Sequence, residues 1–204
     1  MENRIITLGR QFGSSGREVG KAVAELLGID YYDKELISVA AKASGLNAQF
    51  LESYDEKRTN SLLYSLVMGH AGMILAGQGA TSVELLAQQA QRDAVLNVAK
   101  KGPCVIVGRC ADYILRENPG LVRVFICADM PDRIAHVEKR ENISAAKAEE
   151  RIRRMDKART SYYNFNTDQQ WGAAENYDLC INISRCGIQK AAETIAAFAN
   201  TIRK

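Results

Sequence analysis

Short apolar runs alternate along the chain with longer segments of helical period. Most of the runs are apolar at successive positions, as in strands whose two faces are both buried. Strands that alternate with helices are typical of a parallel sheet, so we predict an α/β fold with three layers and helices on both faces of the sheet. The five predicted strands cover residues 5–8, 29–32, 104–107, 122–127 and 179–183.

Apolar residues recur at helical spacing in five further segments. The first covers residues 15–27 and is followed by Gly28, a residue type that commonly ends helices. The others cover about 81–98, a stretch that begins near Pro131, much of 144–163, and 188–202.

The second and third predicted strands are far apart in the sequence. About 70 residues separate them, against roughly 10 to 12 in a minimal crossover between parallel strands. This segment has a helical character interrupted by glycines. It is either an ordinary helical elaboration or a mobile subdomain that closes over a substrate, and the sequence alone leaves both interpretations open.

The composition excludes several classes of protein. Of the 204 residues, 47% are hydrophobic and 25% charged, which is too apolar for a disordered chain. The 27 basic and 24 acidic residues give a net charge of +3, far from the excess of a dedicated nucleic-acid binder. There is no apolar signal segment and no run of about 18 apolar residues, so we expect a cytoplasmic protein without a membrane span. The five cysteines include no Cys-x-x-Cys pair, so no zinc or redox centre is expected.

The segment Gly9–Glu18 carries the first candidate chemistry. It joins the first strand to the first helix, where glycines let N–H groups turn toward an anion and the helix adds a positive end. Against the phosphate-binding pattern G-x-x-x-x-G-K-S/T, the residues at the first glycine, the lysine and the hydroxyl position are Gln11, Arg17 and Glu18. Arginine keeps the charge and offers paired donors to phosphate. Glu18 either binds magnesium or pairs with an arginine, and the alternative for the whole segment is a structural turn.

Arginines also occur where ligands of parallel sheets collect. Arg109 follows the third strand, with Asp112 one helical turn further on, and the alternative there is a surface ion pair. Arg151, Arg154 and Arg159 share one broad face of the predicted helix 144–163. Three arginines on one face repel each other unless an anion lies among them, so this face suits a polyphosphate; a solvated basic helix is the alternative.

Several motifs occur together over nearly the whole chain. They are I-T-L-G-R-Q-F-G-S-S-G-R-E-V-G at the start, Y-Y-D-K-E-L-I from Tyr31, Gly108-Arg109, R-x-D-x-x-R-x-x-Y-Y from Arg154 and Y-D-L-x-I-N from Tyr177. Each alone is weak, but the combination resembles the cytidylate kinase-like family of P-loop kinases. The resemblance implies a single nucleoside monophosphate kinase-like domain over residues 1–204. Its core would comprise 1–33, 102–140 and 164–204, with a helical acceptor-binding insertion at about 34–101 and an arginine-bearing lid at about 141–163.

The resemblance also implies roles for individual residues. ATP would bind to Gln11, Phe12, Gly13, Ser14, Ser15, Gly16, Arg17 and Glu18, and the acceptor to Asp33, Arg109 and Asp112. The transferring phosphoryl group would contact Arg17, Arg151, Arg154 and Arg159. The implied cofactors are ATP and Mg²⁺, with Glu18 as the candidate metal ligand.

The activity implied is ATP-dependent phosphoryl transfer to a nucleoside monophosphate, with CMP or dCMP as the leading acceptor. A phosphate acceptor is already anionic, so alignment and charge neutralisation suffice without a general base. Two alternatives stay open. One is a kinase for another small metabolite, in which Asp33 or Asp112 acts as base. The other is a non-catalytic nucleotide-binding regulatory module, which the altered positions 11, 17 and 18 favour. The expected partners are nucleotide substrates, and the sequence does not indicate an oligomeric state.

Overall fold

The computed structural model describes residues 4–33 and 80–202 of the chain. Its five strands form one parallel sheet in the order β2-β3-β1-β4-β5, which confirms the predicted fold class. The strands are β1 Ile5–Arg10, β2 Asp30–Tyr32, β3 Cys104–Val107, β4 Leu121–Cys127 and β5 Leu179–Asn182, each within two residues of its predicted bounds. Of the insertion predicted at about 34–101, residues 34–79 lie outside the described part of the chain.

The first strand lies in the middle of the sheet. Ile5 of β1 is level with Cys104 of β3 on one side and with Leu121 of β4 on the other. Ile5 belongs to a hydrophobic cluster on one face of the sheet, whereas Ile6 and Leu8 belong to the cluster on the opposite face. All three side chains are fully buried, which explains why this strand is apolar at successive positions.

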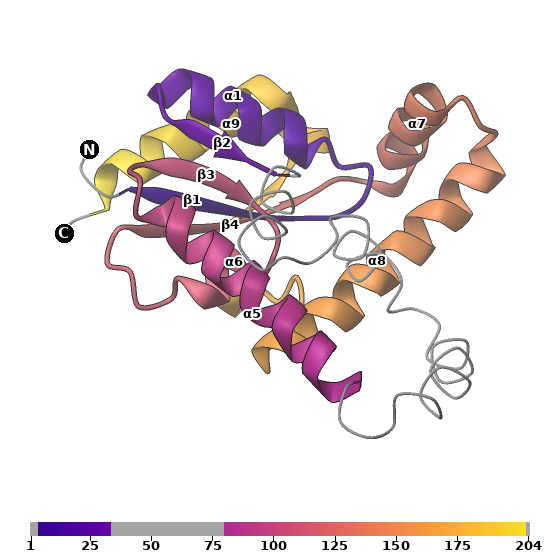
Figure 1. Ribbon diagram of the computed structural model, residues 1–204. Helices are drawn as coiled ribbons and strands as arrows, with labels where there is room; N and C mark the ends of the chain where they lie inside the picture. Colours follow the sequence, from indigo (N-terminus) through magenta and orange to yellow (C-terminus); the bar gives the residue numbers. More distant parts are fainter. Residues whose placement is uncertain (1–3, 34–79, 203–204) are drawn as a thin grey trace.

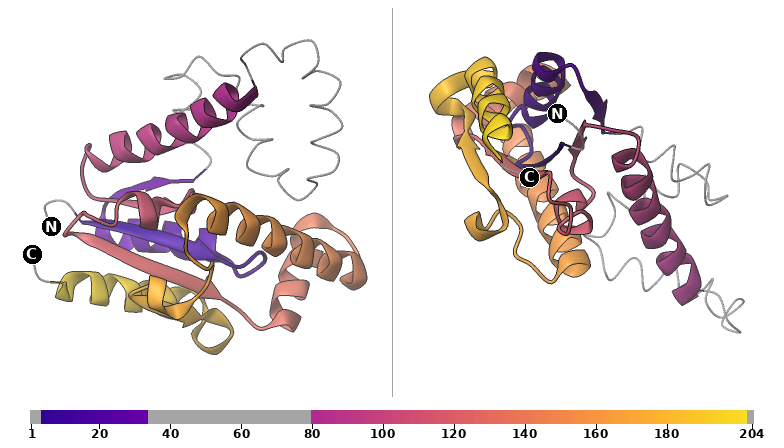
Figure 2. Two further views of the ribbon diagram at one scale, coloured as in Figure 1. Left: turned by 90° about the horizontal axis from the view of Figure 1, so that it is seen from below. Right: turned by 90° about the vertical axis from the view of Figure 1, so that its left-hand side faces the viewer.

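Helices cover both faces of the sheet, as predicted (Figure 1). α1 and α9 lie side by side on one face, and α5 and α6 lie on the other (Figure 2). The helices are α1 Gly16–Leu27, α5 Ala80–Ala99, α6 Ala111–Ile114, α7 Met130–Glu141, α8 Ala145–Thr167 and α9 Ile183–Thr201, and a 3₁₀ turn, Ala174–Asn176, precedes β5.

Two glycines explain the bounds of their helices. Gly28 has a φ of 63°, and its N–H points to the carbonyl groups of Ala24 and Glu25, so it ends α1 as predicted. Gly187 interrupts α9 with a φ of 74°. Regular helix therefore resumes at Ile188, which is where the apolar spacing predicted its start.

α7 and α8 pack against each other beyond the carboxyl ends of the strands (Figure 1). Val137 of α7 and Ala148 and Ile152 of α8 form a small buried cluster there, separate from the two clusters on the sheet. The segment predicted as a lid, about 141–163, includes most of α8. Its movement as a lid stays a prediction.

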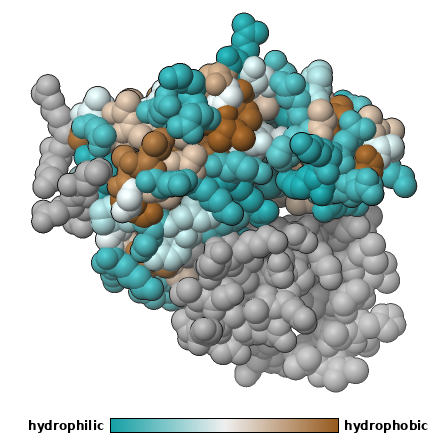
Figure 3. Space-filling view, turned by 90° about the horizontal axis from the view of Figure 1, so that it is seen from above, coloured by the Kyte–Doolittle hydropathy of each residue, from teal (hydrophilic) through white to brown (hydrophobic). Residues whose placement is uncertain are grey.

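The surface over α1 and α9 is mixed in character. Small groups of hydrophobic residues lie there among hydrophilic ones (Figure 3). Within residues 4–33 and 80–202, no helix has the length and apolar character that a membrane span requires.

Candidate functional site

A cavity of about 320 Å³ lies at the carboxyl ends of β1 and β3. Its wall is formed by the end of β1 and the loop that follows, the start of α1, the turn after β3, and parts of α7 and α8. Of the residues predicted to form the site, 11–18, Arg109, Asp112, Arg151 and Arg159 line this cavity. The structure therefore brings together predicted residues from three separate parts of the sequence, at the edge where open parallel sheets bind their ligands.

The loop between β1 and α1 has the geometry of an anion-binding turn. Gly13 and Ser15 have positive φ values of 79° and 50°, so the backbone reverses hand twice within three residues. Such alternation turns N–H groups to one side of the chain. The hydroxyl of Ser14, which is fully buried, donates to the carbonyl oxygen of Gln11 at 2.9 Å and closes the turn. The N-terminus of α1 follows at once and adds its positive end.

Gln11 occupies the position of the first glycine in the phosphate-binding pattern, and it holds the loop in place. Its N–H donates to the carbonyl oxygen of Ile126 at 3.0 Å, and its side-chain Oε1 accepts from the N–H of Ala128 at 3.2 Å. Both contacts join the loop to the end of β4. The side chain of Gln11 is thus engaged by the protein's own backbone.

Arginine side chains from several parts of the fold converge on the cavity. Among them are Arg10 at the end of β1, Arg17 in α1, Arg109 after β3 and Arg159 in α8. Burial lowers the pKa of Arg10 and that of Arg159, and it lowers the pKa of Arg109 to about 10. Neighbouring arginines act in the same direction, whereas Asp33 opposes the shift at all three and Asp156 opposes it at Arg159. Several cations buried together favour an anion in the cavity.

Arg10 was not among the residues predicted from the sequence. Its position at the end of a buried strand is the same signal that identified Arg109, whereas the glycine pattern indicated only the loop residues from Gln11 onward. Gly108 makes room for it: a Cβ atom at this position would overlap the guanidinium group of Arg10. The carbonyl oxygen of Arg10 also accepts a hydrogen bond of 2.9 Å from Nη1 of Arg159.

Asp33 lies against the arginines rather than in the wall of the cavity. Its Oδ2 is 2.6 Å from Nε of Arg17, and its Oδ1 is 3.8 Å from Nη2 of Arg10. The residue is only 6% exposed. Asp33 is therefore a counter-charge for two arginines of the site, and its predicted contact with an acceptor stays a prediction.

The turn after β3 has a left-handed backbone. Gly108, Arg109 and Cys110 have φ values of 74°, 63° and 52° in succession. Two successive residues other than glycine in this region cost free energy, and such conformations concentrate at functional sites. The turn directs Arg109, predicted to bind the acceptor, into the wall of the cavity.

Asp112 forms a buried polar pair with a tyrosine of α8. The hydroxyl of Tyr163 donates to its Oδ2 at 2.7 Å, and Asp112 is 8% exposed. Burial raises the pKa of Asp112, while the hydrogen bond from Tyr163 opposes the rise. Burial and the neighbouring carboxylate also raise the pKa of Tyr163. Asp112 thus brings a carboxyl group with a raised pKa into the wall of the cavity.

The arginines of α8 divide into two groups. Arg151 and Arg159 line the cavity, whereas Arg154 is exposed and does not line it. At 100° per residue, Arg154 and Arg159 are about 140° apart around the helix, too far for both to face the same cavity. Arg153 points away and pairs with Glu149 at 2.6 Å. The predicted role of Arg154 in phosphoryl transfer therefore rests on the sequence alone.

Glu18 is exposed at the start of α1, beside a histidine. Its Oε1 is 3.7 Å from Nε2 of His136, and Nδ1 of that histidine is 3.1 Å from Oγ of Ser15. In the described parts of the chain, no three His, Cys, Asp or Glu side chains are grouped to hold a metal. Magnesium bound to nucleotide phosphates needs only one or two protein carboxylates. Glu18 lines the cavity and fits that smaller requirement.

The sheet order, the loop after its first strand and the arginine-lined cavity define the fold class of P-loop kinases. Two solved shikimate kinases share this fold. The enzyme from Bacteroides thetaiotaomicron is 12% identical, with a TM-score of 0.56 over 97% of this chain and 98% of that chain. The enzyme from Acinetobacter baumannii, solved in complex with shikimate, is 13% identical, with a TM-score of 0.54 over 98% of this chain and 96% of that chain. At these identities the similarity concerns the fold alone.

The chain belongs to the cytidylate kinase-like family, whose model matches residues 5–185. This confirms the resemblance seen in the sequence motifs. An uncharacterized protein from Eubacterium ventriosum ATCC 27560 has a similar solved structure, with 28% identity and a TM-score of 0.72 over 97% of this chain and 99% of that chain. No curated protein matches the chain. Family and fold together support a nucleotide-dependent phosphotransferase.

Proposed function

We propose that this protein catalyses ATP-dependent phosphoryl transfer to a nucleoside monophosphate, with CMP or dCMP as the acceptor. The observation that carries the proposal is the convergence of Arg10, Arg17, Arg109 and Arg159 on one cavity beside the loop after β1. Asp33 pairs with Arg10 and Arg17. A triphosphate group and a monophosphate group bring the negative charge that such a cluster favours.

The hydrogen-bond donors of the loop and of α1 fit the phosphates of ATP. The turn at Gly13 and Ser15 and the start of α1 offer main-chain N–H groups, and Arg17 offers a guanidinium group at the first turn of the helix. Glu18 would hold Mg²⁺ on the phosphates, directly or through water. Bound there, the ion supplies charge neutralisation between the phosphate groups.

A second cavity, of about 310 Å³, would hold the nucleoside part of ATP. Gly13 and Ser15 line both cavities, so the second one adjoins the loop. Its other walls come from α7, with Asp132 and His136, and from the start of α9, with Ser184 and Arg185. A nucleotide whose phosphates lie at the loop would extend its base toward this mixture of polar groups.

The residues of the first cavity would act by alignment and charge neutralisation. Arg17, Arg151 and Arg159 would neutralise the charge that develops on the transferred group. Arg109 would bind the acceptor's phosphate, and Asp112 a polar group of the acceptor. An attacking phosphate oxygen carries no proton, so this mechanism requires no general base.

A second candidate acceptor is a small alcohol. The observation in its favour is Asp112, whose raised pKa and place in the cavity wall suit a carboxylate that accepts a proton from a hydroxyl group. In that reaction the hydroxyl oxygen attacks the γ-phosphorus as Asp112 takes its proton, and ADP leaves.

The experiment that tests the proposal is an ADP-release assay with a panel of nucleoside monophosphates and small alcohols. Turnover with CMP or dCMP, and not with alcohols, would support the proposed function. Turnover with an alcohol alone would favour the second candidate. ATP binding by calorimetry without turnover of any acceptor would contradict both and leave a nucleotide-binding module.

A further inference from the structure

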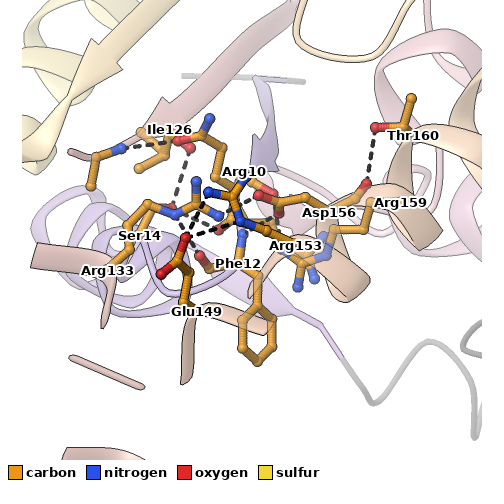
Figure 4. Close-up of polar contacts among 12 residues, drawn as sticks. Arg10, Phe12, Ser14, Ile126, Arg133, Glu149, Arg153, Asp156, Arg159 and Thr160 are labelled. Atoms are coloured by element: carbon orange, nitrogen blue, oxygen red, sulfur yellow. Dashed lines mark hydrogen bonds and ion pairs between the residues drawn. The ribbon is translucent and has the colours of Figure 1, made fainter. Parts of the chain in front are cut away.

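Phe12, in the loop after β1, contacts both α7 and α8, by its main chain and by its ring. Its N–H donates to Oδ1 of Asp156 in α8 at 2.7 Å, and its carbonyl oxygen accepts from Nε of Arg133 in α7 at 2.8 Å. Nη2 of Arg133 also contacts Oδ2 of Asp156. Figure 4 shows this closed arrangement of Phe12, Arg133 and Asp156, which we call the loop clamp.

The loop clamp is largely buried, and it joins residues far apart in the sequence. Arg133 is 4% exposed, and its hydrogen bond to Phe12 joins residues separated by 121 positions in the chain. The contact between Phe12 and Asp156 joins residues separated by 144 positions. Hydrogen bonds that involve charged groups are stronger than neutral ones, especially away from water. The loop clamp therefore fixes both main-chain polar groups of one loop residue from outside the loop.

The ring of Phe12 reinforces the attachment. It is 8% exposed and packs in the same small cluster as Val137, Ala148 and Ile152, all of which belong to α7 and α8. Three guanidinium groups also lie near its face: the centroid of the ring is 4.8 Å from Cζ of Arg140, 5.7 Å from that of Arg151 and 5.4 Å from that of Arg159. Cations at such distances are attracted to an aromatic face.

The geometry next to Phe12 shows how closely the loop and α7 approach each other. A Cβ atom at Gly13 would lie 3.0 Å from the carbonyl oxygen of Arg133 and 3.0 Å from Cγ2 of Val137. Gly13 is also one of the two positive-φ residues that turn the loop. The side of the loop away from the cavity is thus packed on α7, so the path of its main chain depends on that helix.

We propose that Arg133 and Asp156 are positioning residues, which set the conformation of the phosphate-binding loop through the main chain of Phe12. The inference rests on the proposed function in that the loop is taken to bind ATP phosphates. Asp156 lies on the helix that carries Arg151 and Arg159, so the loop clamp also fixes these arginines relative to the loop. Its carboxylate acts through Phe12 rather than on the transferred group.

The test compares Asp156→Ala and Asp156→Asn with the matched control Glu149→Ala. Glu149 is a carboxylate on the same helix that accepts from Arg153 instead of from the loop. Two quantities are measured for each protein: the hydrogen exchange rate of the Phe12 amide, and the dissociation constant of MgATP by calorimetry.

In Asp156→Ala, we expect Phe12 amide exchange to become at least about tenfold faster and MgATP binding about tenfold weaker, since hydrogen bonds to a charged group are lost. Asp156→Asn keeps an oxygen that can accept from Phe12 and should lie between wild type and Asp156→Ala. Glu149→Ala should match the wild type in both quantities. Where CMP supports turnover, the KM for ATP should rise in Asp156→Ala while the KM for CMP changes less.

Unchanged exchange at Phe12, or unchanged MgATP affinity in a variant whose loop exchanges faster, would overturn the proposal. So would an equal increase of exchange in β1 and α1, because that result would mean a general loss of stability. If Asp156→Ala does not fold, Arg133→Lys replaces it; this variant keeps a positive charge near Asp156 but lacks the Nε donor to Phe12, and unchanged exchange in it would overturn the proposal equally.

The outcomes separate this inference from the proposed function. A wild-type protein that binds MgATP without transferring phosphate to any acceptor would contradict the proposed function, while exchange and affinity would still decide on the loop clamp. A wild-type protein with no measurable affinity for MgATP would overturn both.

Discussion

Arg17 at the start of α1 and Asp33 after β2 form a close ion pair, with 2.6 Å between Nε and Oδ2. Arg17 is the side chain proposed to bind the outer phosphates of ATP. Because of this ion pair, a bound phosphate group and the carboxylate of Asp33 would both contact the guanidinium group of Arg17. Asp33 is 6% exposed, and water screens its charge little.

The first prediction concerns this competition. In Asp33→Asn the negative charge beside Arg10 and Arg17 is removed, so phosphate ligands should bind more tightly, by roughly tenfold if about 1.4 kcal/mol of repulsion is relieved. Calorimetric titration of wild type and variant with MgATP measures the change. Equal or weaker binding by a folded variant would show that Asp33 does not oppose the phosphates.

The second prediction concerns the arginines of the cavity. Replacing Arg17 or Arg159 by alanine should lower kcat by about 100-fold with the fold intact, because each removes a charge that stabilises the transition state. Arg153→Ala is the matched control, since Arg153 lies on α8 but pairs with Glu149 away from the cavity. Steady-state kinetics with CMP and circular dichroism check this expectation, and a kcat within about threefold of wild type for both cavity variants would contradict the assignment.

The third prediction separates backbone strain from the packing of Arg10. Gly108 and Gly28 both have positive φ values, 74° and 63°, but a Cβ at Gly108 would overlap Arg10 whereas one at Gly28 meets nothing within 4 Å. Gly28→Ala should therefore cost about 1 kcal/mol of unfolding free energy, and Gly108→Ala at least about 2–3 kcal/mol.

Urea unfolding of both variants measures these costs. Displacement of Arg10 should also weaken MgATP binding in Gly108→Ala alone. Equal losses of stability together with equal affinities for the two variants would mean that Gly108 is needed only for its φ.

The fourth prediction concerns pH. Burial raises the pKa of Asp112, so the folded protein keeps this proton to higher pH than the unfolded chain does. The contribution to stability is fully present below the ordinary Asp pKa, near 3.8, and is lost as pH rises through the raised pKa. Asp112→Asn keeps an acceptor for Tyr163 but does not titrate. The unfolding free energy of Asp112→Asn should therefore rise relative to that of the wild type as the pH increases from about 4 to about 7.

Urea unfolding of both proteins across that range provides the measurement. A difference in unfolding free energy that stays constant with pH would show that Asp112 titrates normally in the folded protein.

The fold could be predicted because its strands are buried on both faces. Ile5, Ile6 and Leu8 are all apolar because one faces the α5 and α6 layer and two face the α1 and α9 layer. The stop at Gly28 was equally visible, since it depends on a single residue type at the end of an apolar period. Both signals are local, and local signals are what a sequence shows directly.

The candidate site was predictable where its residues follow a strand or a glycine-rich turn, and in part where they share a face of one helix, as Arg151 and Arg159 do. Arg109 follows β3 and could be found in this way. The relationship of Asp156 to Phe12 could not, because its carboxylate meets the loop through the packing of α8 on α7. Asp156 is part of the R-x-D-x-x-R motif, but nothing local in the sequence indicates that Arg133 is its partner. Arg154 shows the opposite limit: a shared helix face predicted its role, but the side chain is exposed and does not line the cavity, so that role stays a prediction.

The central place of β1 has a consequence for how the chain is made. Ile5 is synthesised roughly a hundred residues before its neighbours on the two sides, Cys104 and Leu121. A nascent chain must therefore carry an apolar strand without either partner until β3 and β4 have been translated. Folding that waits for distant partners is slow and leaves hydrophobic segments exposed to aggregation. For this protein, the interval between the synthesis of β1 and that of β4 is when the apolar β1 segment is most open to aggregation.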